Sequence, residues 1–292
     1  MIFHEIWEAD MTSNGVLPLI KGVSEDPKKT DTGYVIVDMN PMPEPDSSAN
    51  ASEHNKISVF KEVVIPAGKQ RSYDLFMKLH DKTTSTGAAE INEFLGFAAN
   101  TPPMRLARKY AEDNHQLKAG CSMEEWIQFL KAIWFEPFKG SNTCYFEQVF
   151  LGGQGGKRHK LGGQLFWYHY YVNDGPYEAL KKADSIVFIK HVEVTRTEES
   201  KLAEVISIKY TLEEQENGGQ SQISIKDAGG FFVGTSAEGL MAMGTVASLD
   251  GREHIPVELN GESFDLTVVH MKENGKDLAR TFYPVIKEAV PV

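Results

Sequence analysis

The sequence is poor in cysteine and has no long hydrophobic run. Only two of its 292 residues are cysteines, Cys121 and Cys144, too few for a secreted disulfide framework, and we expect two reduced, buried thiols. No apolar run approaches the roughly 18 residues that a membrane span needs. The segment MIFHEIWEAD carries acids and no apolar stretch typical of a secretory signal. We therefore expect a soluble, cytoplasmic protein with no membrane partner.

Basic charge is also scarce. Lysine and arginine number 30 against 41 acidic residues, so the formal net charge is -11. Such a field repels phosphate chains, and tight nucleic-acid binding would need a local basic cleft; no DNA partner is expected. A hydrophobic content of 41% over 292 residues is ordinary for a globular protein of one large domain or two lobes.

The pattern of apolar residues changes near residue 140. Before it, spacings of three or four residues predict helices over residues 4–11, 73–81, 88–100, 104–114 and 122–138. After it, short apolar or alternating runs broken by glycine predict antiparallel strands, with one helix over 237–249; the strands include 144–153, 162–172, 202–212, 262–272 and 277–289. The chain is therefore predicted to be α+β, with a helix-rich lobe over 1–140 and an antiparallel-sheet-rich lobe over 141–292.

Common catalytic and metal-binding motifs are absent. The sequence holds no Walker A, GxGxxG, HExxH, CxxC or GxSxG pattern, and none of its nine histidines has metal-ligand spacing. The glycine-rich segment GGQGGKRHKLGG favours a hairpin tip. Its Lys157, Arg158, His159 and Lys160 are four potentially cationic residues in an acidic chain, so they are the best candidates for contact with an anionic ligand.

A run of aromatic residues follows this segment, in the expected strand 162–172. Most of these rings are interpreted as core, with Trp167 as the candidate for stacking on a base or another flat ligand. His169 comes five residues after Gln164. Alternation along a strand predicts that the two side chains lie on opposite faces.

Five segments together resemble the EndoU family, the uridylate-preferring endoribonucleases also called XendoU-like. The sequence WEAD is similar to the family's W-x-A-D, and FEQVFLGG is similar to F-E-H-V-F-x-G-E. The sequence LGGQLFWYHYY lies where the family has G-F-H-N-W. Residues 226–246 match the K-x-x-G-S-x-F-x-G-[ST]-S-P-E-F-E-x-A-L-Y stretch without a gap, and ARTFYPV resembles A-T-A-Y-P-V. The resemblance covers nearly the whole chain and implies an EndoU-like fold with a cleft between or within the lobes.

The resemblance also implies a chemistry. Family members cut RNA by attack of the 2′-hydroxyl on the adjacent phosphorus, which leaves a 2′,3′-cyclic phosphate, often with Mn²⁺ assisting. Their catalytic set is two histidines, a lysine, a threonine or serine, and a tyrosine. Carried over position by position, the lysine is Lys226, the threonine is Thr281 and the tyrosine is Tyr283, while Gln148 and Gln164 occupy the two histidine positions.

This double replacement weakens the prediction of ribonuclease activity. A glutamine amide forms hydrogen bonds but does not exchange protons near neutral pH. Each general acid or base contributes about 10²–10⁴-fold to the rate, so we expect classical activity to be near zero. Gly153 replaces an acid of the family pattern, and Gly239 replaces an aromatic residue. His159 is the candidate substitute for a lost histidine.

Three functions stay open. The favoured one is a cleft repurposed for a small-molecule ligand or substrate, with neutral hydrogen bonds from Gln148 and Gln164 and with cyclisation, lyase or isomerisation as candidate chemistry. The first alternative is binding of single-stranded, U-containing RNA without cleavage, and the second is a weak endoribonuclease with a rebuilt proton relay. No cofactor is firmly indicated, and Mn²⁺ enters only through the resemblance.

Overall fold

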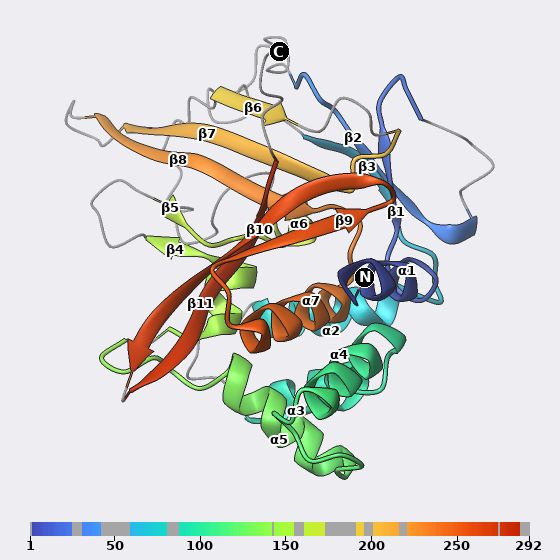
Figure 1. Cartoon of the computed structure of the whole chain (residues 1–292). Helices are drawn as coiled ribbons and strands as arrows, with labels where there is room; N and C mark the ends of the chain where they lie inside the picture. The colour runs from blue at the N-terminus through green and yellow to red at the C-terminus, as the bar shows by residue number, and fades with distance from the viewer. Residues whose placement is uncertain are drawn as a thin grey trace.

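The computed structural model places helices mainly on one side of the molecule and long strands on the other (Figure 1). It describes residues 2–24, 31–41, 59–80, 88–141, 143–154, 161–172, 191–195, 201–215, 221–273 and 275–286. None of the helices in these ranges is long and apolar enough to cross a membrane. The predicted α+β class is confirmed.

The helices of the N-terminal half form where the apolar spacing predicts them. They are α1 (Ile2–Met11), α2 (Gln70–His80), α3 (Ala88–Ala98), α4 (Pro102–Asp113) and α5 (Met123–Trp134). The two prolines after α3 form the first turn of α4, where the missing N–H groups have no helical partner to lose. Local sequence signals therefore place these helix starts.

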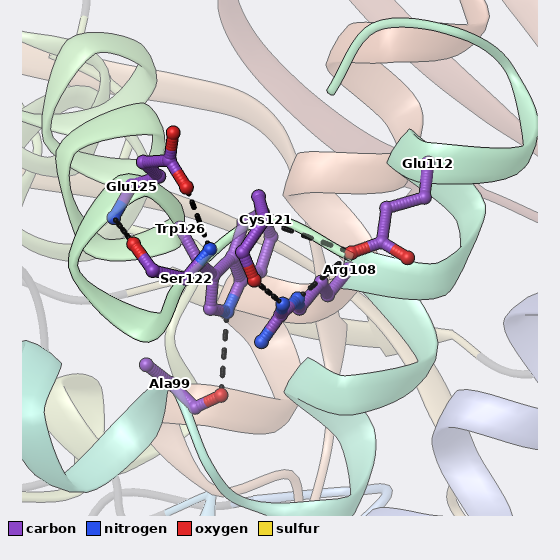
Figure 2. A network of polar contacts seen from close by, with 7 residues as sticks. All are labelled: Ala99, Arg108, Glu112, Cys121, Ser122, Glu125 and Trp126. Carbon is purple, nitrogen blue, oxygen red and sulfur yellow. Dashed lines mark hydrogen bonds and ion pairs between the residues drawn. The ribbon is translucent and has the colours of Figure 1, made fainter. Parts of the chain in front are cut away.

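Figure 2 shows how the junction between α4 and α5 is held. Ser122 and Glu125 form a capping box, in which the Glu125 Oε2 accepts from the Ser122 N at 2.6 Å. Arg108 donates to the Cys121 carbonyl and, at 3.0 Å, to Glu112. Both Cys121 and Cys144 are free and buried, as predicted, and burial raises the pKa of the Cys144 thiol to about 11. These thiols therefore stay protonated at neutral pH.

A small sheet in the N-terminal half was not predicted. β1 (Leu17–Ile20) pairs in parallel with β2 (Tyr34–Val37), which pairs antiparallel with β3 (Phe60–Val64). The strands have four or five residues each, too few for alternation to stand out in the sequence. The first 140 residues are thus mixed rather than purely helical.

Two antiparallel sheets make up most of the C-terminal half. One has the order β6-β7-β8 and the other β11-β10-β9. Their strands are β6 (His191–Thr195), β7 (Val205–Gln215), β8 (Ser221–Phe232), β9 (His254–Leu259), β10 (Glu262–Glu273) and β11 (Lys276–Val285). The prediction of antiparallel strands in this half is confirmed.

Helix α7 (Ala237–Asp250) lies at the centre of the fold. It contacts α1, α2, α4 and β11, and every residue of it up to Ala247 is buried. Trp134 Nε1 donates to Thr245 Oγ1 at 2.9 Å. A Cβ added at Gly244 would lie 2.6 Å from the ring of Trp134 on α5, so this glycine leaves room for the Trp134 side chain. The helix predicted over 237–249 is confirmed.

Two predicted strands are wrong. Residues 144–153 form a helical turn that continues as the π-helical segment η2 (Glu147–Leu151) and ends in β4 (Gly153–Gln154). Residues 162–172 form the end of β5 (Leu161–Gly162), a turn, and α6 (Trp167–Val172). The reason is packing: Phe146 and Phe150, four residues apart, stack with ring centroids at 4.5 Å, which requires helical spacing.

Candidate functional site

Backbone hydrogen bonds join the two segments that carry Gln148 and Gln164. Gln164 N donates to Gln148 O at 3.2 Å, and Leu165 N donates to Val149 O at 2.7 Å. Gly163 has φ 70°, and a Cβ there would lie 2.0 Å from Gln148 O. Only glycine allows this approach, so the glycine before Gln164 brings the two positions together.

Gln164 is held in an unusual backbone conformation. Its φ is 55°, in the left-handed region, and its side chain is 0% exposed. A non-glycine residue stays in this region only where its surroundings hold it there, and such residues gather at functional sites. Gln148 is half-buried on η2, and π-helical turns are also frequent at such sites.

A histidine lies directly against the Gln164 amide. The Nε2 of Gln164 is 3.2 Å from the Nδ1 of His169, whose residue is only 3% exposed. An amide NH₂ only donates, so Nδ1 is the acceptor in this contact, the role it has when the ring proton is on Nε2. The prediction that His169 faces away from Gln164 is wrong, because a turn and α6 replace the expected strand.

Thr281 and Tyr283 lie on β11, on either side of the buried Phe282. They pair with Val269 and Thr267 of β10, and alternation turns both away from the core side of the sheet. Both residues are half-buried. Among the described residues, the buried Thr281 Oγ1 has no hydrogen-bond partner. Buried hydroxyls are normally paired, so this group is an exception that a partner outside the described residues would satisfy.

Lys226 belongs to β8, where it pairs with Tyr210 of β7; its side chain lies outside the described residues. β8 contacts both β5 and β11, and β11 contacts η2. A Cβ at Gly230 of β8 would lie 2.1 Å from Pro284 O of β11, so the two strands approach closely there. The elements that carry the five positions implied by the resemblance thus contact one another, while the roles of these positions stay predictions.

The remaining predicted ligand residues divide into two groups. Lys157, Arg158, His159 and Lys160 lie outside the described residues. Trp167 is 0% exposed, and its Nε1 donates to Thr235 O at 2.8 Å. With its polar atom paired and no exposed face, Trp167 is a core residue, and this placement does not support a stacking role.

A Mn²⁺ site does not emerge from the described residues. They contain no group of three or more histidine, cysteine, aspartate or glutamate side chains that could hold a metal ion. The site side chains among them carry amide and hydroxyl groups, whereas Mn²⁺ prefers a set that includes carboxylates. These residues do not fit the ion, and no step is derived through it.

A second buried polar cluster, which sequence reasoning missed, fastens α1 to the start of α7. Ser236 donates to the Asp10 carboxyl from its N at 2.8 Å and from its Oγ at 2.5 Å, while its Oγ accepts from Gly239 N. A Cβ at Gly239 would lie 2.2 Å from the Asp10 carboxyl. The space that an aromatic residue would fill at position 239 is therefore occupied by Asp10.

This cluster contains two buried carboxyl groups. Glu238 accepts from Asn14 Nδ2 and from Ser72 Oγ, each at 2.6 Å, and both acids are 0% exposed. Burial and, secondarily, repulsion by Glu238 raise the pKa of Asp10 to about 7. Burial also raises the pKa of Glu238. We name Asp10, Glu238 and their partners Ser236, Ser72 and Asn14 the acidic cluster.

Comparison with known proteins identifies a family and a fold for this chain. A family model described as Endoribonuclease XendoU matches residues 24–284. No curated protein matches. The solved structure of XendoU, described as a splicing-independent snoRNA-processing endoribonuclease, is similar over 98% of this chain and 96% of that chain, with 19% identity and a TM-score of 0.63. At this identity the likeness establishes the fold.

A second solved structure is much less similar. It is the endoribonuclease Nsp15 of Middle East Respiratory Syndrome Coronavirus, 13% identical over 60% of this chain and 40% of that chain. Its TM-score of 0.28 is too low to support a statement about the fold.

Proposed function

The chain belongs to the XendoU endoribonuclease family, and from this premise we propose that it binds a nucleotide-sized ligand where η2, β5, β8 and β11 meet, without the two-histidine route to RNA cleavage. The ligand would contact the neutral amides of Gln148 and Gln164 and the hydroxyl of Thr281. Its phosphate would be neutralised by Lys226.

One observation supports this proposal above all: a backbone hydrogen bond from Gln164 N to Gln148 O, at 3.2 Å, joins the two segments that carry these glutamines. Both residues stand at positions where the resemblance implies histidines. Because amides donate and accept hydrogen bonds but do not exchange protons near neutral pH, this pair suits recognition rather than acid–base catalysis.

Net charge favours a small ligand over a polymer. The net charge of -11 repels a long phosphate chain more strongly than it repels a single nucleotide. A uridine nucleotide is the natural probe, because the family resemblance implies uridylate preference and the uracil edge offers one donor and two acceptors to amide groups.

A second candidate function is RNA cleavage with a substitute histidine. The observation that favours it is His169, whose Nδ1 lies 3.2 Å from Gln164 Nε2. A buried imidazole so near the site is a titratable group next to a position that has lost one.

One experiment separates these functions. The purified protein is mixed with 3′-UMP while its melting temperature is followed, and in parallel with a fluorescent U-rich oligoribonucleotide, with and without Mn²⁺. We expect 3′-UMP to raise the melting temperature and the oligonucleotide to stay intact. Lys226→Ala should abolish the shift, whereas Lys118→Ala, at an exposed lysine between α4 and α5, should not.

Two other results would contradict the proposal of a nucleotide-sized ligand. A 2′,3′-cyclic phosphate product that disappears in Lys226→Ala but persists in Lys118→Ala would establish a nuclease. Tight, salt-sensitive binding of the intact oligonucleotide without a response to 3′-UMP would instead establish an RNA-binding protein.

A further inference from the structure

The imidazole of His169 is fixed in place by its surroundings. α6 is anchored by its buried neighbours: Trp167 is 0% exposed and donates to Thr235 O at 2.8 Å, and Tyr170 is 1% exposed. The His169 ring meets Phe76 of α2 edge-on, with centroids 6.1 Å apart. A ring held between a core helix and an aromatic neighbour presents its nitrogens in set directions.

The side-chain amide of Gln164, which contacts this imidazole, can adopt two orientations. The terminal torsion of a glutamine side chain has a broad, roughly two-fold preference, so the amide can present either its oxygen or its nitrogen in a given direction. In the tautomer with the ring proton on Nε2, the His169 Nδ1, 3.2 Å from Gln164 Nε2, is an acceptor and removes this ambiguity. In that tautomer, reversal would set the amide oxygen against the lone pair of Nδ1, which is repulsive in a buried site.

We propose that His169 is a positioning residue for Gln164. Its Nδ1 accepts from Gln164 Nε2, which turns the amide nitrogen toward α6 and the carbonyl oxygen away from it. This proposal rests on the proposed function, in which Gln164 contacts the ligand. An oxygen so directed accepts from a ligand N–H, as at N3 of uracil, and disfavours a ligand with a lone pair at that position, as at N3 of cytosine.

The backbone at Gln164 supports this role. Its φ of 55° is maintained although the residue is not glycine, and its N–H is bonded to Gln148 O at 3.2 Å. The main chain is therefore held from the η2 side and the side chain from the α6 side. A residue held at both ends is preorganised, which reduces the entropy that ligand binding would otherwise lose.

The test compares two substitutions of similar size. His169→Asn keeps an acceptor, because the Asn oxygen lies near the position of Nδ1, whereas His169→Leu removes it. Calorimetry with 3′-UMP and 3′-CMP measures the preference of each protein. We expect His169→Leu to lower the preference for 3′-UMP about tenfold, the size of one net hydrogen bond, and His169→Asn to restore most of it.

A second measurement needs no substitution at His169. In the ¹⁵N NMR spectrum of the unsubstituted protein, we expect the His169 ring to carry its proton on Nε2 and the Gln164 amide protons to be strongly inequivalent. Gln164→Leu identifies the amide signal by its loss. This arm decides the positioning contact even where His169→Leu fails to fold.

Two results would overturn the proposal: a ring proton on Nδ1, or an unchanged nucleotide preference in a folded His169→Leu. Failure of the proposed function looks different. In that case the unsubstituted protein binds neither nucleotide, while the NMR signals still report whether His169 holds the amide.

Discussion

The glutamine pair and the acidic cluster are both buried polar assemblies that join distant segments, but they differ in charge. At Gln148 and Gln164, neutral amides occupy positions where the family resemblance implies titratable histidines. In the acidic cluster, the carboxyl groups of Asp10 and Glu238 are kept in the interior, both 0% exposed. Amide groups do not titrate, whereas buried carboxyl groups make the fold sensitive to pH.

The largest expected effect comes from restoring titratable groups to the neutral assembly. In the double variant Gln148→His/Gln164→His, we expect cleavage of a U-rich oligoribonucleotide to increase by about 10² or more, because a general acid or base contributes about 10²–10⁴-fold. The readout is the rate of 2′,3′-cyclic phosphate formation. The volume control is Gln148→Leu/Gln164→Leu, which should stay inactive; equal rates in both variants would show that proton transfer is not what the site lacks.

The next effect concerns pH and the acidic cluster. Because the pKa of Asp10 is raised from 3.8 to about 7, its protonated form stabilises the folded state at low pH, and this contribution declines as pH rises from 3.8 and is lost above about 7. The slope for one such group is about 1.4 kcal/mol of unfolding free energy per pH unit.

Urea unfolding at several pH values between these limits checks this prediction. Asp10→Asn should flatten the decline, since an amide cannot ionise, whereas Gln148→Leu should leave the slope unchanged because it removes only a group that does not titrate. Acids whose pKa values are lowered on folding, such as Asp38 and Asp250, have the opposite effect on stability. The stability that they contribute is lost as the pH falls below the usual pKa of an aspartate. A slope that Asp10→Asn does not alter would disprove the assignment.

A smaller effect tests the packing of the acidic cluster. Gly239→Ala places a Cβ 2.2 Å from the Asp10 carboxyl, so we expect it to destabilise the protein by about 1–3 kcal/mol through overpacking. Gly96→Ala is the matched control, since nothing lies within 4 Å of a Cβ there and α3 should gain about 0.5–1 kcal/mol. Denaturant midpoints of the two variants should therefore move in opposite directions.

Helix starts and long strands were predictable because their signals are local. Ser122 and Glu125 form the capping box that their spacing indicates. The strands β10 and β11 are 12 and 10 residues long, and β10 alternates from Phe264 to Val268, long enough for its period to be recognised. The family motifs, four of them in the C-terminal half, correctly indicated the EndoU-like fold.

The secondary structure of residues 144–172 could not be predicted from local signals. Its short apolar runs fit a buried strand and a buried helix equally well, and only the stacking of Phe146 on Phe150 decides for the helix. With the wrong element, His169 was assigned to the wrong side of Gln164. The acidic cluster was missed because its members are far apart in the chain: Asp10 and Ser236 are separated by 226 positions.

The sequence by itself determined the α+β class, the positions of most helices and the family, since each depends on residue type and on neighbours along the chain. Only the tertiary structure decided that His169 contacts Gln164 and that Asp10 accepts hydrogen bonds from Ser236, next to Glu238. These contacts depend on how close two backbones come, which at Gly163 and Gly239 requires the absence of a Cβ. Distance between segments is a property of the packed chain, and no local pattern encodes it.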